Sequence, residues 1–182
     1  MDVRCRCLRR FIGYSILAHW SLNGTDQGLS LHGGPTFVEG RYPGSKAINF
    51  NQPSNCFARI PKVELRGRSF TIALWVKVNS SLDREQVVFS DWYQPYQFFL
   101  QVTKQESYIL FQRHSFSNLW FSCTSTETLK INTWQHVAVT WDQPGGIIRL
   151  YIDAKEVAAI AKIFNTSETW YPPTRDMHLR DR

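Results

Sequence analysis

Apolar residues recur along this chain in short runs that alternate with polar residues. The clearest case is 134–157, where the alternation extends over 134–141 and 148–152 on either side of a Pro-Gly-Gly turn. Because alternation with period two is typical of half-buried strands, this segment is predicted to form an antiparallel hairpin.

Similar runs fill the rest of the sequence between Gly, Pro, Asn and Ser residues, and no long stretch keeps a helical period of 3.6. The runs predicted to be strands are 15–22, 47–50, 56–60, 69–78, 86–90, 97–103, 108–113, 119–122, 135–141, 147–153 and 156–161. Many short strands separated by turn signals indicate an all-β fold. Their number suits a two-sheet antiparallel jelly-roll sandwich.

The run 69–78 shows how one strand is expected to face the core. Its apolar face carries Phe70, Ile72, Leu74, Val76 and Val78. Its other face carries Thr71, Ala73, Trp75 and Lys77. We expect the apolar face to pack between the two sheets, so that an aspartate at Leu74 prevents folding.

The composition bounds the kind of protein. A length of 182 residues allows one well-buried core and is short for two sandwiches, so we expect one domain. No stretch approaches the roughly 20 apolar residues of a membrane helix, so no membrane span is expected in this chain. The net charge of +6 is concentrated at the start, where Arg4, Arg6, Arg9 and Arg10 face only Asp2. A basic tail without interleaved aromatic residues predicts a solvated terminus and no nucleic-acid partner.

The start of the chain imitates the basic and apolar regions of a signal peptide, but no small-x-small cleavage site follows. Residues 16–22 are also needed for the first predicted strand. We therefore expect residues 1–14 to be a poorly ordered basic tail. A signal for secretion is expected to lie outside this chain, which suggests a module of a longer protein or a truncated gene model.

Four cysteines, Cys5, Cys7, Cys56 and Cys123, permit three full pairings. Cys5 and Cys7 are too close to each other for an easy bridge. Cys56 and Cys123 lie in predicted strands and form either a disulfide or two buried thiols, and both alternatives stay open.

Three glycosylation sequons begin at Asn23, Asn79 and Asn165, and all three fall in predicted turns, where an acceptor is exposed. They favour the secretory pathway. The sequence therefore predicts a glycoprotein that is secreted or that forms the ectodomain of a cell-surface protein.

Five blocks in a consistent order carry a resemblance to a known family. They are His-Trp-Ser-Leu-Asn-Gly-Thr at 19–25, the glycine-containing segment at 40–50, Ser-Phe-Thr-Ile-Ala-Leu-Trp-Val at 69–76, and the two strands of 134–157. In these blocks the chain resembles the laminin-G-like and pentraxin-like domains of the concanavalin A-like lectin/glucanase superfamily. The resemblance implies a lectin-like jelly-roll sandwich over 15–164 that serves extracellular recognition or cell adhesion.

Three departures from the family pattern limit what the resemblance implies. Ala73 and Ala138 stand where pentraxins proper place two cysteines, so the chain is closer to the laminin-G-like branch. Ala154 stands where the family has glycine in an Asp-Gly turn, and a left-handed conformation there costs alanine about 1 kcal/mol. No closing strand of the family type is recognisable in 165–182. We therefore expect a truncated domain end that lacks this strand, and marginal stability or aggregation of the isolated chain.

Calcium is the usual ligand of the family that the chain resembles, bound by acidic side chains and carbonyl oxygens on a sandwich rim. The candidate ligands here are Asp91 and Asp142, which also fit the simpler interpretation of turn-forming residues.

Two further surfaces are candidates for ligand binding. Trp92, Tyr93 and Tyr96 lie in one predicted loop and could stack on a sugar, although rim packing explains most aromatic residues of a sandwich. A basic segment between two strands could meet a sulfated polysaccharide, or be a solvated loop. Its cations are Arg59, Lys62, Arg66 and Arg68.

No catalytic residue is assigned. The glucanases of this superfamily carry paired glutamates in a Glu-x-Asp-x-x-Glu pattern, which the sequence lacks. It also lacks Gly-x-Ser-x-Gly, a phosphate loop and His-Glu-x-x-His. The sequence therefore predicts a non-catalytic module for a glycan or an extracellular protein. A degenerate glycoside-hydrolase-like sandwich stays open if Glu85, Glu106 or Glu127 meets a second carboxylate in one groove, and so does a non-binding structural remnant.

Overall fold

The computed structural model describes residues 15–24, 28–50, 56–61, 63, 65, 69–79, 84–91, 98–114, 120–161 and 177–180, with the backbone alone at 114, 120 and 177–180. Every regular element within these ranges is a β-strand. They contain no helix with the length and apolarity that a membrane crossing needs. The predicted basic tail over 1–14 lies outside the described residues.

The strands are short, as the turn signals of the sequence predict. In chain order they are β1 (Ser30–His32), β2 (Thr36–Glu39), β3 (Lys46–Asn49), β4 (Phe57–Ile60), β5 (Phe70–Lys77), β6 (Gln86–Asp91), β7 (Phe98–Val102), β8 (Tyr108–His114), β9 (Trp120–Thr128), β10 (Trp134–Asp142), β11 (Ile147–Ile152), β12 (Lys155–Ala161) and β13 (Met177–Arg180). The predicted strands from 47–50 onward correspond to β3–β12, whereas β1 and β2 are not among the predicted strands.

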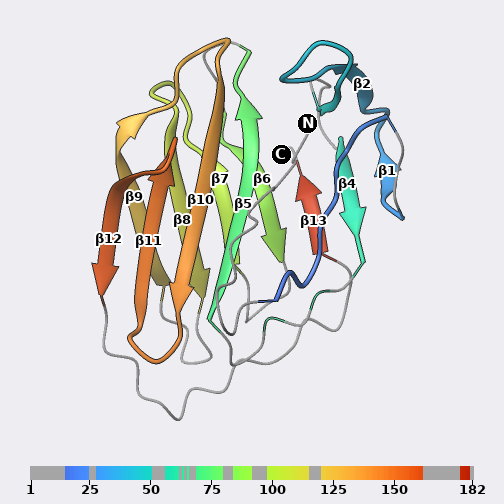
Figure 1. The fold of residues 1–182 in the computed structure, drawn as a ribbon. Coiled ribbons are helices and arrows are strands. Elements are labelled where there is room, and N and C mark those ends of the chain that lie inside the picture. Colours follow the sequence, from blue (N-terminus) through green and yellow to red (C-terminus); the bar gives the residue numbers. More distant parts are fainter. Residues whose placement is uncertain are drawn as a thin grey trace.

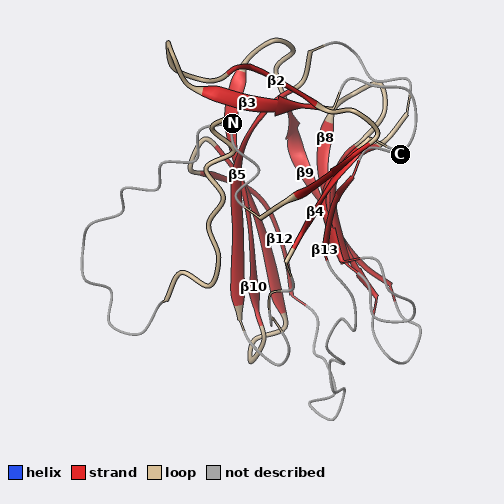
Figure 2. Cartoon of the chain, turned by 90° about the vertical axis from the view of Figure 1, so that its right-hand side faces the viewer, coloured by secondary structure: helices blue, strands red, loops and turns tan. Residues whose placement is uncertain are grey.

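The strands form two sheets that face each other, as predicted for a two-sheet sandwich (Figures 1 and 2). A seven-stranded sheet has the order β1-β4-β13-β6-β7-β8-β9, and a four-stranded sheet has the order β12-β11-β10-β5. The hairpin of β2 and β3 lies across one end of the sandwich in Figure 2. Neighbouring strands of the sheets run antiparallel, which confirms the predicted all-β architecture.

The four-stranded sheet has one buried face and one outer face. Leu74 on β5 pairs with Val137 on β10, which pairs with Ile152 on β11, and all three side chains are buried. One position along, Ala73 pairs with Ala138 on the outer face. The predicted facing of 69–78 is therefore confirmed, because its apolar set lies inward.

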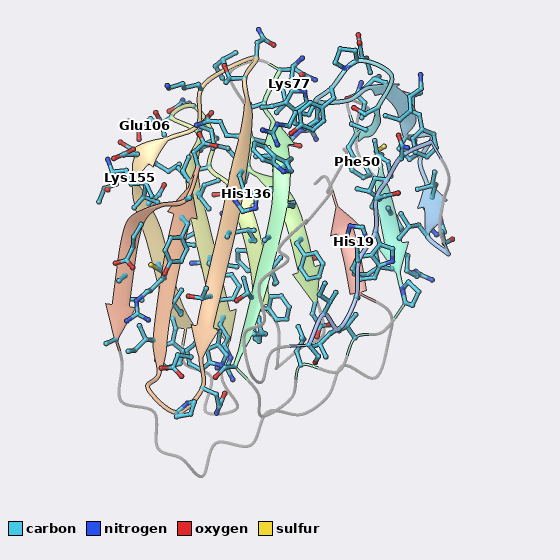
Figure 3. The ribbon with its side chains drawn as sticks, viewed as in Figure 1. His19, Phe50, Lys77, Glu106, His136 and Lys155 are labelled. Atoms are coloured by element: carbon cyan, nitrogen blue, oxygen red, sulfur yellow. The ribbon has the colours of Figure 1, made fainter. Side chains whose placement is uncertain are left out.

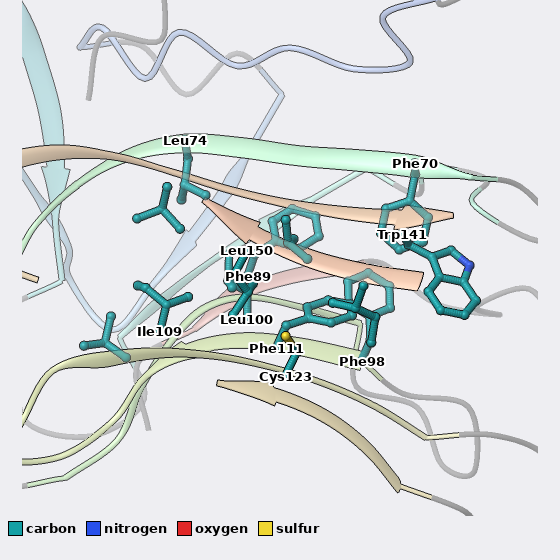
Figure 4. Close-up of a cluster of buried hydrophobic side chains, with 14 of the residues drawn as sticks. Phe70, Leu74, Phe89, Phe98, Leu100, Ile109, Phe111, Cys123, Trp141 and Leu150 are labelled. Carbon is teal, nitrogen blue, oxygen red and sulfur yellow. The ribbon is translucent and has the colours of Figure 1, made fainter. Parts of the chain in front are cut away.

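The core between the sheets is rich in phenylalanine (Figure 4). The fully buried Phe98 of β7 lies 5.7 Å from Phe70 of the opposite sheet and 5.8 Å from Phe111 of the neighbouring strand, between ring centroids. Such tilted ring pairs add to the stabilisation that comes from burying the ring area. The aromatic residues of the strands thus fix the spacing of the two sheets.

Irregular chain adds to the core beside β4. Leu22 and Leu65 belong to the same buried cluster as Ala58 and Ile60, and Trp20 packs against it. The predicted strand over 15–22 is wrong, because residues 15–24 contain no strand. The backbone turns at Leu22 (φ 53°) and Gly24 (φ 86°), which an extended strand does not do.

The expected absence of a closing strand is also wrong. The backbone of β13 pairs with β4 over its whole length and with β6 at His178, and so it fills the place between them. Four residues, Met-His-Leu-Arg, are too short for an alternation signal, and pairing on both sides fixes this strand instead. The argument from a missing strand for marginal stability therefore no longer holds.

Cys56 and Cys123 cannot form the disulfide that the sequence left open. Cys56 directly precedes β4, while Cys123 lies on β9, five strand positions away in the same sheet. Five spacings amount to about 24 Å, whereas a disulfide needs Cα atoms about 4.4–6.8 Å apart. Both thiols are buried, as in the second alternative.

Cys123 is expected to resist alkylation in the folded chain. Burial, and secondly the negative charge of Glu156, raise the pKa of its thiol to about 11. At pH 8 this leaves about a thousandth of the thiol as reactive thiolate. Mass spectrometry after iodoacetamide treatment should find Cys123 unmodified in native buffer and modified in guanidinium chloride. Alkylation at equal rates in both solutions would contradict its position in the core.

The turn between β11 and β12 keeps the shape that the family builds with Asp-Gly, although alanine replaces the glycine. Asp153 and Ala154 have φ angles of 50° and 68°, both in the left-handed region. Two such residues are typical of a type I′ hairpin turn. Alanine there carries a conformational cost of roughly 1 kcal/mol that glycine would not.

We therefore expect Ala154→Gly to raise the free energy of unfolding by about 0.5–1 kcal/mol. The matched control is Ala159→Gly on the exposed side of β12, which should lower it by a similar amount because glycine weakens a strand. Urea unfolding of both variants provides the measurement. A destabilised Ala154→Gly variant would show that the turn has another conformation.

Candidate functional site

The structure does not bring the two candidate calcium ligands together. Asp91 is in register with Phe98, which is in register with Arg113, and all three side chains are buried between the sheets. The guanidinium carbon of Arg113 lies 4.4 Å from the ring centroid of Trp141 on the opposite sheet. Asp91 therefore belongs to a buried charged row and not to an open rim.

Asp142 lies on the outer face of the four-stranded sheet, one residue beyond the inward-facing Trp141. Its Oδ1 atom accepts a hydrogen bond from the Ser69 hydroxyl at 3.4 Å, and that hydroxyl also accepts the N–H of Gln143. This is the turn-forming role that the sequence offered as the alternative. Among the described residues, no three acidic, histidine or cysteine side chains form a group that could hold a metal ion.

The predicted ligand-binding residues fall mostly where the structure gives no description. Those outside the described residues are Trp92, Tyr93, Tyr96, Lys62, Arg66, Arg68 and the sequon residue Asn165. Arg59 is half-buried on β4 and in register with Ser30 and His178. Asn23 and Asn79 are exposed, and the Asn23 side-chain oxygen also accepts the backbone N–H of Lys46 at 3.0 Å.

The three glutamates of the hydrolase alternative lie on different elements. Glu85 directly precedes β6, and Glu106 lies in the turn between β7 and β8. Glu127 on β9 forms an ion pair with Lys155 of β12. None of these positions offers the Glu-x-Asp-x-x-Glu geometry of a glucanase strand.

A candidate site that the sequence reasoning did not single out lies on the outer face of the four-stranded sheet, which faces the viewer in Figure 3. Two neighbouring cross-strand pairs form its floor, Trp75 with His136 and Lys77 with Trp134. The Trp75 and His136 rings meet edge to face, with centroids 5.2 Å apart. Figure 3 shows Lys77 and His136 on adjacent strands at one end of the sheet.

The tight turn 40–45 brings a cation over this floor. The Gly40 N–H donates to the carbonyl oxygen of Ser45 at 2.8 Å. The Ser45 hydroxyl accepts the N–H of Tyr42 and donates to the carbonyl oxygen of the same residue. A Cβ atom on Gly40 would lie 2.8 Å from the backbone oxygen of Lys46, so only glycine fits this close approach. The glycine of this block thereby fixes the position of Arg41.

Arg41 is held by two aromatic rings. Its guanidinium carbon lies 3.3 Å from the ring centroid of Trp75 and 4.7 Å from that of Tyr42. Within the described residues, the Arg41 guanidinium makes no hydrogen bond and no ion pair. We call Arg41, Tyr42, Trp75, Lys77, Trp134 and His136 the Arg41 surface.

The surroundings of His136 within the Arg41 surface disfavour its protonated form. Burial lowers the pKa of His136, the nearby Asp153 opposes this shift, and the Arg41 cation adds to it. Asp153 accepts hydrogen bonds from the Gln135 side chain at 3.0 Å and from the His136 backbone at 2.9 Å. Its two oxygens thus accept from neutral donors on the neighbouring strand β10.

A family model described as the concanavalin A-like lectin/glucanases superfamily, of the laminin G type, matches residues 53–175. The chain belongs to this superfamily. The predicted family resemblance is thus confirmed. Among curated proteins no sequence matches the chain significantly.

Solved structures share the sandwich of this superfamily member. The binding domain of Paraclostridial Mosquitocidal Protein 1 is 16% identical with a TM-score of 0.70, over 84% of this chain and 39% of that one. Domain 4 of AbnA, a GH43 extracellular arabinanase from Geobacillus stearothermophilus solved with arabinotriose, is 19% identical with a TM-score of 0.58, over 80% and 72%. Domains LG4-5 of the mouse laminin alpha1 chain are 12% identical with a TM-score of 0.58, over 94% and 39%. The chain thus spans well under half the length of the first and third of these structures.

Proposed function

We propose that this chain is a non-catalytic extracellular module that binds a glycan. Membership of the concanavalin A-like lectin/glucanases superfamily is the observation that carries the proposal. The sandwich of AbnA domain 4, which was solved with arabinotriose, supports it because a sugar chain is held there on the same architecture. In this chain the Arg41 surface offers the aromatic and polar groups that a sugar-binding surface needs.

The positions of the carboxylates support a role in binding and not in hydrolysis. Glu85 and Glu127 lie at β6 and β9, which are three strand spacings apart in the seven-stranded sheet. Three spacings amount to about 14 Å. Paired carboxylates of glycosidases are about 5–9.5 Å apart. The ion pair with Lys155 also engages Glu127.

An extracellular location is part of the proposal. The exposed sequon residues Asn23 and Asn79 support it, and so does the extracellular arabinanase that shares the fold. We propose a glycosylated recognition or adhesion module of a larger secreted or cell-surface protein, with a glycan or glycoprotein as its partner. The proposal assigns no calcium site, and the dependence of binding on calcium is measured in the test below.

The proposal is tested by applying the folded, fluorescently labelled chain to a glycan array, in calcium and in EDTA. We expect saturable binding to a restricted set of glycans. In parallel, the bound glycans are incubated with the chain and assayed for new reducing ends. Release of reducing sugar would overturn the non-catalytic assignment, and an array without any binding would overturn the glycan ligand.

A further inference from the structure

Arg41 combines three properties that together require an explanation. Its charge is held in place by two aromatic rings, it has no acidic partner within the described residues, and it lies on an outer face. By contrast, Arg149 of β11, which also lies on the outer face of the four-stranded sheet, forms an ion pair with Glu156 at 3.5 Å. The two arginines therefore differ in whether their N–H groups are already engaged.

An arginine fixed by aromatic rings suits the recognition of planar or branched anions. The aromatic rings stack on the flat faces of the guanidinium. Its N–H donors lie in the plane of the group and point outward from its edge, where they can bind a carboxylate or sulfate in a bidentate manner. Because the rings already restrict the side chain, less conformational entropy is lost when an anion binds. The rigid turn 40–45 restricts it further, through the hydrogen bonds of Ser45.

The surroundings of Arg41 extend the site to the size of a sugar. Lys77 follows Trp75 by two residues on the same strand face, about 6.8 Å along β5. Tyr42 is 47% exposed, and the half-buried Trp134 lies beside Lys77, so each can offer a ring to a sugar. A second cation and two aromatic rings are therefore part of the same surface as the fixed guanidinium.

We propose that the Arg41 surface binds the carboxylate or sulfate group of an acidic sugar, with Arg41 as the bidentate donor and Lys77 as the second cation. The proposal rests on the proposed glycan-binding function and adds the chemical class of the ligand. Neutral sugars can stack on the aromatic rings, but they offer no anion to the N–H donors of the Arg41 guanidinium.

Isothermal titration calorimetry with three tetrasaccharides tests the proposal. Hyaluronan supplies carboxylates, heparin supplies sulfates as well, and chitotetraose is neutral. We expect at least one of the two acidic ligands to bind about 10- to 100-fold more tightly than chitotetraose. The acidic ligand that binds identifies whether carboxylate or sulfate is recognised.

The variants are Arg41→Gln, Lys77→Gln and, as the matched control, Arg149→Gln. Arg41→Gln should weaken binding of the acidic ligand about 10-fold or more, and Lys77→Gln about two- to fivefold. Arg149→Gln should have less than a twofold effect. Thermal unfolding of each variant confirms that it is folded. Lys77→Gln tests the second cation without disturbing the stacking of Arg41 on Trp75 and Tyr42.

Equal losses in Arg41→Gln and Arg149→Gln would mean diffuse charge attraction, and would overturn the Arg41 site. Equal affinity for acidic and neutral tetrasaccharides would overturn it too, while leaving the glycan-binding function intact. Failure of all three tetrasaccharides and of the glycan array would overturn both proposals.

Discussion

Leu74→Asp is expected to leave the chain unable to fold. Leu74 is buried on β5 and in register with the fully buried Val137 at the centre of the sandwich. Removing a buried leucine costs about 2–5 kcal/mol, and a buried carboxylate without a partner adds several more. The sum approaches the total stability of about 5–15 kcal/mol of a typical domain.

The matched control is Ala73→Asp, one residue earlier on the exposed face of the same strand. It should fold with a stability close to that of the parent chain, because its carboxylate stays in water. Soluble yield and far-ultraviolet circular dichroism distinguish the two variants. A folded Leu74→Asp variant together with an unfolded Ala73→Asp variant would reverse the assigned faces of β5.

Asp91→Ala is expected to lower the free energy of unfolding by about 3–5 kcal/mol. Asp91 and Arg113 flank Phe98 in one inward-facing row, and both are almost fully buried. Removing the carboxylate leaves the groups that interact with Asp91 unsatisfied in a buried place, whereas replacing both charged side chains removes the need for such partners. The double variant Asp91→Ala/Arg113→Met should therefore lose less stability than Asp91→Ala alone.

Guanidinium unfolding in EDTA provides the measurement, with Asp142→Ala as the control. Asp142 is also an acid near the same end of the sandwich, but among the described residues its side chain bonds only the Ser69 hydroxyl, so its loss should cost no more than about 1 kcal/mol. If the parent chain gains stability on adding calcium while Asp91→Ala does not, Asp91 is a calcium ligand and the buried-row interpretation fails.

Periodicity was sufficient to predict β3–β12, but not β1, β2 or β13. The alternation in 69–78 and 134–157 is strong because each strand has one buried and one outer face, so β5, β10 and β11 lie where the pattern predicts. The first predicted strand failed for a physical reason. Trp20 and Leu22 are apolar because they pack on the core, yet the turn at Leu22 and Gly24 prevents an extended pairing. Apolar character alone does not distinguish these two situations.

The closing strand and the candidate site illustrate two other limits. Four residues carry no measurable period, so β13 becomes visible only through its pairing with β4 and β6. The Arg41 surface joins residues more than 30 positions apart, and no local pattern links Arg41 to Trp75. A signal was nevertheless present. Trp75, Trp134 and His136 all occupy outward positions of β5 and β10, where large rings need an explanation.

The central claim is that this sandwich binds a glycan without converting it. A nuclear magnetic resonance titration of the isotope-labelled chain, with the tightest oligosaccharide from the glycan array, tests it most directly. We predict saturable shifts confined to one surface, including the Trp75 or Trp134 indole signal, while the oligosaccharide spectrum shows no cleavage. Shifts that are absent in a folded chain, or shortening of the oligosaccharide during the titration, would contradict the account.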